Sequence, residues 1–301
     1  SWSHDIDLAY RYRFDKARDA GIKLGWGSDQ ITGTDIFGGK LTQQFSNRKT
    51  SVKPWYRYRW NLAGKREKGP GGSARERSVW GPAEAKLSYI YESKDYKEPL
   101  PPTQSLDYKR HGVELNLEQK FLQKQNLLLG AEFYRRNYSN DPAKQARPNL
   151  GADNTQGAGR KQNYRIYSLG WEIDLAGDGK AGLEYKRFSR IDPFQDYYTY
   201  SADIVAGVFK YRPVQPLFLK TRIEYEARDY KVQEAPVPGP NPKLEKKYLR
   251  FNFSAAYDVL SYWSLWLQYN RADRDTNKIQ TSATGREYLD NIILLGTTLH
   301  W

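Results

Sequence analysis

Hydrophobic and polar residues alternate along most of this chain with the period of two that is typical of β-strands. The alternation is clear at both ends, in His4 to Phe14 (HDIDLAYRYRF) and in Tyr288 to Trp301 (YLDNIILLGTTLHW). The same pattern recurs in residues 51–62, 83–91, 113–121, 127–136, 167–175, 181–186, 217–228, 249–258 and 265–270. The chain is therefore predicted to be all-β, with strands that are apolar on one face and polar on the other.

The lengths of the connections between these segments predict the topology. Short connections lie near 122–126, 176–179, 213–216 and 260–263, and long ones near 94–107, 137–162, 191–198, 232–246 and 276–287. This alternation is typical of an up-and-down sheet with short turns at one edge and long loops at the other.

The first part of the chain follows this rule less well. The 15–21 turn is short where a long loop is expected, and the 64–80 connection is long where a short turn is expected. Lys40 to Phe45 is a weak strand, and residues 202–208 are apolar on both faces, so their orientation stays open. The pattern gives about fourteen strands if Lys40 to Phe45 is one, and about twelve if residues 16–50 are mostly loop.

Composition restricts the class of protein further. Hydrophobic residues make up only 39% of the chain, whereas aromatic residues reach 15%, with 24 Tyr and 9 Trp; the mean hydropathy is −0.86. Aliphatic residues are too few for a large buried core, and aromatic residues are too many for a disordered chain. A barrel with a wet lumen resolves this conflict, because half of the side chains of each strand can be polar.

The last strand closes on an aromatic residue, Trp301, and in this it resembles the C-terminal strand of bacterial outer-membrane β-barrels. The resemblance implies a transmembrane, antiparallel, up-and-down β-barrel of about fourteen strands, with twelve or sixteen as alternatives. It also implies short periplasmic turns, long extracellular loops and an outer-membrane location. We expect residues 1–301 to form this single domain.

Two other classes also account for part of the pattern. A soluble β-sandwich would alternate as well, but its strands average nearer six residues than the ten or more found here. A nucleic-acid-binding protein would explain the net charge of +13 and the Arg and Tyr interleaving of YRYRF and YRYRW. The same interleaving results from lipid-facing Tyr and lumen-facing Arg, so we expect no nucleic-acid partner.

In a barrel, the polar face of each strand lines the lumen, and function is expected there. Arg11, Arg13, Arg57 and Arg59 form the most one-sided cluster; alternatively, they balance Glu-rich strands across the bore. The basic excess favours passage of anions, because a low-dielectric wall focuses the field of its fixed charges. The predicted pore-lining residues are Arg11, Arg13, Arg57, Arg59, Arg136, Lys186, Arg222, Arg228, Arg250, Glu114, Glu132 and Glu172.

The sequence offers little for catalysis or metal binding. It has no Cys and only three His, namely His4, His111 and His300. His4 and His300 would meet where the first and last strands pair, but no Ser-containing motif accompanies them. We therefore expect no enzymatic activity, no cofactor and no metal site.

These inferences favour a porin-like channel for small polar solutes that are anionic or sugar-like. One alternative is the barrel component of a complex that exports or assembles a polysaccharide or protein. Another is a closed structural barrel that binds a periplasmic partner at the basic 64–80 loop. The expected surroundings are outer-membrane lipid and lipopolysaccharide.

Overall fold

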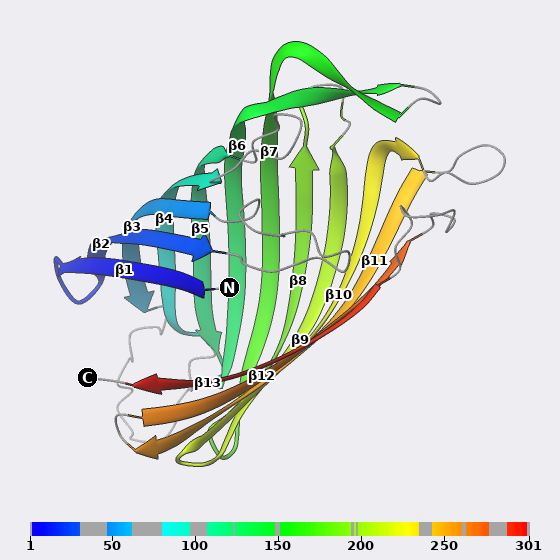
Figure 1. Ribbon diagram of the computed structural model, residues 1–301. Coiled ribbons are helices and arrows are strands. Elements are labelled where there is room, and N and C mark those ends of the chain that lie inside the picture. Colours follow the sequence, from blue (N-terminus) through cyan, green and yellow to red (C-terminus); the bar gives the residue numbers. More distant parts are fainter. Residues whose placement is uncertain are drawn as a thin grey trace, which may run out of the picture.

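The computed structural model contains thirteen strands (Figure 1). It describes residues 2–30, 47–61, 80–96, 107–122, 124–147, 151–193, 196, 198–234, 243–260, 263–276 and 288–299. The strands are β1 (Trp2–Arg13), β2 (Arg18–Gln30), β3 (Asn47–Asn61), β4 (Trp80–Tyr96), β5 (Tyr108–Phe121), β6 (Gln125–Arg147), β7 (Gly151–Leu175), β8 (Gly179–Ile191), β9 (Tyr200–Val214), β10 (Leu217–Glu234), β11 (Lys243–Leu260), β12 (Trp263–Thr276) and β13 (Tyr288–Leu299). No described residues form a helix that is long and apolar enough to cross a membrane.

All thirteen strands belong to one strongly curved sheet (Figure 1), in which each strand pairs antiparallel with its neighbours in the sequence. The predicted all-β, antiparallel, up-and-down architecture is confirmed, with thirteen strands in the described residues against the expected fourteen. β1 and β13 are the two edges of this sheet. The weak strand expected at Lys40 to Phe45 and most of the 64–80 connection lie outside the described residues; β2 pairs directly with β3.

Contacts between side chains identify the concave face of the sheet. Lys53 on β3 forms an ion pair with Glu114 on β5, 2.5 Å away, although β4 lies between the two strands. Lys210 on β9 reaches Glu172 on β7 in the same way, at 3.5 Å. Side chains can bridge over a strand only where they converge, on the concave side. The polar face of the strands is therefore the concave one.

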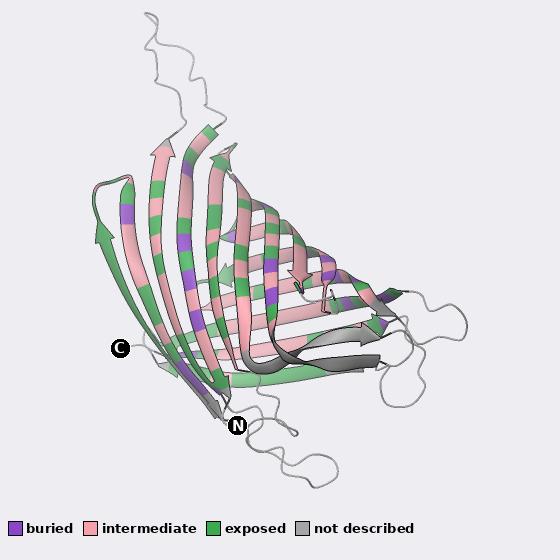
Figure 2. Cartoon of the chain, turned by 90° about the horizontal axis from the view of Figure 1, so that it is seen from above, coloured by how far each residue is buried: buried purple, intermediate pink, exposed green. Residues whose placement is uncertain are grey.

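The convex face carries the apolar half of the alternation. Exposed and less exposed residues alternate along the strands (Figure 2), and the exposed large hydrophobic residues include Ile6, Leu8, Leu183 and Ile223. An exposed apolar surface of this extent is what a sheet in contact with lipid requires. The register also settles the orientation of residues 202–208, because Val205 pairs with Tyr185 and Tyr225 on the convex face.

Most connections divide between the two edges as expected, and β1 now fits, whereas the long connection between β3 and β4 still falls at the short-turn edge. Residues 14–17 join β1 to β2 at the same edge as the turns at 122–124, 176–178 and 215–216, because all four follow an odd-numbered strand. The short turn near 15–21 is therefore on the short-turn side.

The prediction of a long polar loop at 137–162 is wrong. β6 continues to Arg147 and β7 begins at Gly151, so most of this segment is paired strand. The pairing has irregular register between Asn137 and Lys144. Backbone pairing does not require an apolar face, and this segment lacks the alternation from which strands were predicted.

Close backbone contact explains one glycine on the concave face. A Cβ atom at Gly21 would lie 2.6 Å from Cζ2 of Trp55 on the next strand, whereas a Cβ atom at Gly207 would meet nothing within 4 Å. The indole ring of Trp55 therefore packs onto the bare backbone of β2. Aromatic residues that cover glycines in this way help to fix strand register.

We expect Gly21→Ala to destabilise the barrel by about 1–3 kcal/mol, because the added methyl group must displace the Trp55 ring or the strand. Gly207→Ala is the matched control, and it should leave stability unchanged or raise it by up to about 1 kcal/mol. Urea unfolding from lipid vesicles, followed by tryptophan fluorescence, measures both variants. Equal stability of the two would contradict the packing of Trp55 on Gly21.

Candidate functional site on the concave wall

The register places all twelve predicted pore-lining residues on the concave face. They occupy eight strands, namely β1, β3, β5, β6, β7, β8, β10 and β11, and are interleaved with the convex residues of the same strands. Their neighbours divide this wall into two regions that differ in how the cations are held: a carboxylate-paired region and an aromatic region.

Asp19 on β2 is the centre of the predicted N-terminal arginine cluster. Its side chain is fully buried. It accepts a hydrogen bond of 2.8 Å from Nε of Arg57 and forms an ion pair with Arg11. Arg59 lies 3.7 Å from Asp19, and its Nε donates to Glu84 at 2.9 Å. The cluster is thus compensated by carboxylates on adjacent strands.

A second ion-pair network extends over β8 to β11. Nη1 of Arg222 lies 2.9 Å from Glu184, and Nη1 of Arg250 lies 2.7 Å from Glu224 and 2.8 Å from Glu226. Glu224 and Arg250 stand directly opposite each other on β10 and β11, an arrangement that stabilises strand pairing, whereas Arg222 reaches Glu184 across β9. The charges in this part of the wall are therefore neutralised by ion pairs among its own side chains.

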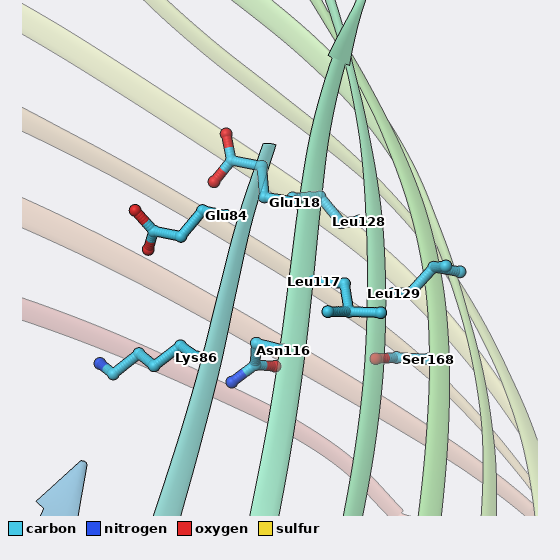
Figure 3. Close-up of a pocket in the computed structure, with 8 residues that line it drawn as sticks. All are labelled: Glu84, Lys86, Asn116, Leu117, Glu118, Leu128, Leu129 and Ser168. Atoms are coloured by element: carbon cyan, nitrogen blue, oxygen red, sulfur yellow. The ribbon is translucent and has the colours of Figure 1, made fainter. Parts of the chain in front are cut away.

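A recess lies in the wall between these two networks, across β4 to β7 (Figure 3). Glu84 and Lys86 of β4 and Glu118 of β5 extend to the same side of the sheet, beside Asn116. Glu118 has no ion-pair partner among the described residues. The charged groups that line the recess are two carboxylates and one ammonium group, so it is a poor place for an anion.

From β5 to β11, guanidinium groups lie over aromatic rings on the concave face. Cζ of Arg110 is 3.9 Å from the centre of the Tyr134 ring, and Cζ of Arg136 is 4.2 Å from that of Tyr108. We call this surface the Arg–Tyr belt. It comprises Arg110, Arg136, Arg160, Arg190, Arg228 and Arg250 together with Tyr108, Tyr134, Tyr138, Tyr164, Phe188, Tyr198, Tyr200, Tyr230 and Tyr248.

The rings of the belt also contact one another from strand to strand. The ring centres are 4.3 Å apart for Tyr134 and Tyr164, 5.8 Å for Tyr164 and Phe188, 5.4 Å for Phe188 and Tyr200, and 5.2 Å for Tyr200 and Tyr230. Tyr164, Tyr200 and Tyr230 are buried. The rings therefore form a floor, and the arginines that cover it present their charge toward the concave side.

Carboxylates neutralise only part of the belt. Arg110 is paired with Glu132, and Arg228 with Glu226. Arg136 has no carboxylate partner among the described residues; it donates to the hydroxyl of Tyr138 at 3.4 Å, and its Nε is buried without a hydrogen-bond partner. A guanidinium held by rings keeps most of its charge available, and the stacking limits its rotation.

The loop at 192–199 orients another arginine of the belt. Nε of Arg190 donates to the carbonyl oxygen of Tyr198 at 2.8 Å, and the amide of Tyr198 donates to Asp192 at 3.2 Å. The ion pair with Lys231 lowers the pKa of Asp196 in the same loop, so this carboxylate stays ionised well into the acidic range. Arg190, like Arg136, has no carboxylate partner within the described part of the chain.

Sequence reasoning found half of the arginines of the belt, Arg136, Arg228 and Arg250, and missed the rest. Arg110 lay before the strand predicted for 113–121, and Arg160 lay within the loop predicted for 137–162. The aromatic floor was also missed, since Tyr and Trp were assigned first to the membrane interfaces. Tyr134 lies two residues from Glu132 and two from Arg136, so the alternation of the strand already placed it on the same polar face.

Comparisons with known proteins bear on the fold. No family model matches the chain, and no curated protein matches it. Two solved structures of OmpT, an outer membrane protein of Vibrio cholerae, match with TM-scores of 0.51 and 0.50 at 12% and 10% identity. The matches cover 99% of this chain and 91% and 89% of those chains. The fold is that of an outer-membrane β-barrel. The concave face is thus the lumen wall, the convex face contacts lipid, and the location is the bacterial outer membrane.

An anion-selective porin from Comamonas acidovorans also matches, with a TM-score of 0.45 and 9% identity, over 98% of this chain and 88% of that chain.

Among the described residues, no group of three His, Asp or Glu side chains is placed to hold a metal ion.

We expect Asp19→Asn to destabilise the barrel by about 1–3 kcal/mol, because it leaves three arginines facing one another around a neutral amide. The range is below that of a fully buried pair, since Arg11 remains 43% exposed. The matched control is Asp7→Asn, which removes the more exposed pair with Lys23, 2.9 Å apart, and should cost at most about 1 kcal/mol. Chemical unfolding in vesicles compares them; an equal cost would mean that Asp19 does not organise the cluster.

Proposed function

We propose that this outer-membrane barrel is a channel for anionic, sugar-like solutes, which it contacts at the Arg–Tyr belt. The observation that carries the proposal is that Arg136 and Arg190 on the lumen wall are held by aromatic rings and hydrogen bonds, with no carboxylate partner among the described residues. The N-terminal arginine cluster is less suited to this role, because Asp19 and Glu84 compensate it.

The chemistry of the belt matches such a solute in two ways. A guanidinium offers a planar fork of N–H donors that fits a carboxylate, and the same donors can bind sugar hydroxyl groups. The aromatic floor holds the forks in place before the solute arrives, so less side-chain entropy is lost on contact. A wall with unpaired cations also raises the local concentration of anions.

The first experiment is the reversal potential of single channels in a planar bilayer under a salt gradient. We expect anion preference in the native protein, and a several-fold to tenfold fall in the anion-to-cation permeability ratio for Arg136→Gln/Arg190→Gln. A charge about 10 Å from a permeating ion contributes about 1.7 kcal/mol at an effective dielectric constant of about 20, and lumen water reduces this.

Arg187→Gln is the matched control, because Arg187 lies on the convex face of β8, where it pairs with Asp203. Its selectivity should equal that of the native protein. Native selectivity in the double variant would contradict the role of the belt. A folded, heat-modifiable barrel that gives no conductance would contradict the channel itself and favour the structural barrel.

The solute class is tested in the same bilayer. A uronic-acid oligosaccharide should interrupt the current at a concentration about tenfold lower than the neutral oligosaccharide of the same length, since each carboxylate gains a charge-assisted hydrogen bond. The difference should disappear in Arg136→Gln/Arg190→Gln. Equal block by both sugars in the native protein would refute the preference for anions.

A further inference from the structure

Four exposed cations gather on the convex face of β5 to β7. Lys109 lies on β5, Arg135 on β6, and Lys161 and Arg165 on β7. We call them the outer basic patch. They project from the wall away from the Arg–Tyr belt, so they cannot take part in lumen transport.

The strand register shows how closely these cations lie. Asn137 of β6 stands between Lys109 and Lys161, which pair with it from either side. One row further along the strands, Arg135 stands opposite Asn163, and in the row after that Arg165 stands opposite Phe133. Paired residues in antiparallel strands have Cα atoms about 4.5–5.5 Å apart, so the four charges fall within a few neighbouring positions.

Within these three rows of described residues, no carboxylate balances these charges. The three rows contain only neutral residues besides the cations: Asn137 and Asn163, His111, Val113 and Phe133. None of the four cations has an ion pair or hydrogen bond with another described residue. Elsewhere on the convex face, by contrast, Arg187 is paired with Asp203.

The position of the patch along the strands corresponds to a membrane interface. Arg135 lies ten residues from the start of β6 at Gln125, and Arg165 ten residues from the end of β7 at Leu175, both counted from the short-turn edge. A transmembrane β-strand spans the hydrocarbon in about 9–11 residues. Since short turns face the periplasm in this class, the patch lies at the outer leaflet.

An apolar surface continues directly from the patch toward the membrane centre. The next row consists of Leu115, Ala131 and Tyr167, and the ring of Tyr167 packs edge-on against Phe133 at 5.6 Å. Leu169 extends this surface one row deeper. A ligand that follows both surfaces needs anionic groups at one end and acyl chains at the other.

We propose that the outer basic patch binds the phosphate groups of an outer-leaflet glycolipid, lipopolysaccharide, whose acyl chains lie along the apolar rows below. Phosphate offers several acceptor oxygens to Arg and Lys, and two phosphates on one sugar headgroup can engage cations in different rows. The bound anion relieves the repulsion among four like charges that have no ion-pair partner in the part of the wall that the structure describes.

The test uses the full chain folded in detergent micelles, with bis-phosphorylated lipid A and its dephosphorylated form as probes, and native mass spectrometry as the readout. The native protein should bind the phosphorylated lipid at least about tenfold more tightly. Arg135→Gln/Lys161→Gln/Arg165→Gln should lose this preference, and the single variant Arg135→Gln should lose part of it. Heat-modifiable migration confirms that each variant is folded.

The matched control is Lys247→Gln/Arg271→Gln on the convex face of β11 and β12. These two cations are also two rows apart, but Lys247 stands opposite Asp275, and Asp273 occupies the row between them. The control should keep the native preference for phosphorylated lipid. Equal binding of the two lipids by the native protein, unchanged binding in the triple variant, or an equal loss in the control would each overturn the proposal.

Discussion

The need to hydrogen-bond every backbone amide within lipid governs this structure. A helix meets the need within one segment, but this chain has no apolar run long enough for that, so its strands must bond to each other. Antiparallel pairing from β1 to β13 then fixes which residues face lipid and which face the lumen. Every charged side chain in a strand is consequently assigned by parity to one of two very different surroundings.

Parity explains why so much of the fold could be predicted from the sequence. Strand identity, the polar face and the short-turn edge follow from the alternation, which is strong wherever one face meets lipid. It is absent from residues 137–162, and the extension of β6 to Arg147 was therefore mistaken for a loop. The strand count stayed approximate for the same reason, because weakly patterned residues such as Lys40 to Phe45 neither support nor exclude a strand.

The candidate site was less predictable, because its properties depend on which strands are neighbours. The alternation placed Arg57 and Arg136 on the same face, and the sequence singled out Arg57 as part of the most one-sided basic cluster. The register reverses this order, since it brings Asp19 to Arg57 and, among the described residues, only aromatic rings and a hydroxyl group to Arg136. No short sequence motif identifies such a partner, because the partner can lie dozens of residues away along the chain.

The basic residues of the barrel therefore fall into three environments with different consequences. Arg57, held by carboxylates, contributes to the stability of the wall and little to the potential in the lumen, because these carboxylates largely cancel its electrostatic field at short range. Arg136, held by rings, keeps its field and is fixed in direction. Arg135, the next residue in the chain, points the opposite way and has no carboxylate partner among the described residues, and in our proposal its counter-ion comes from the membrane. One step along the strand thus separates a lumen-facing cation from a lipid-facing one.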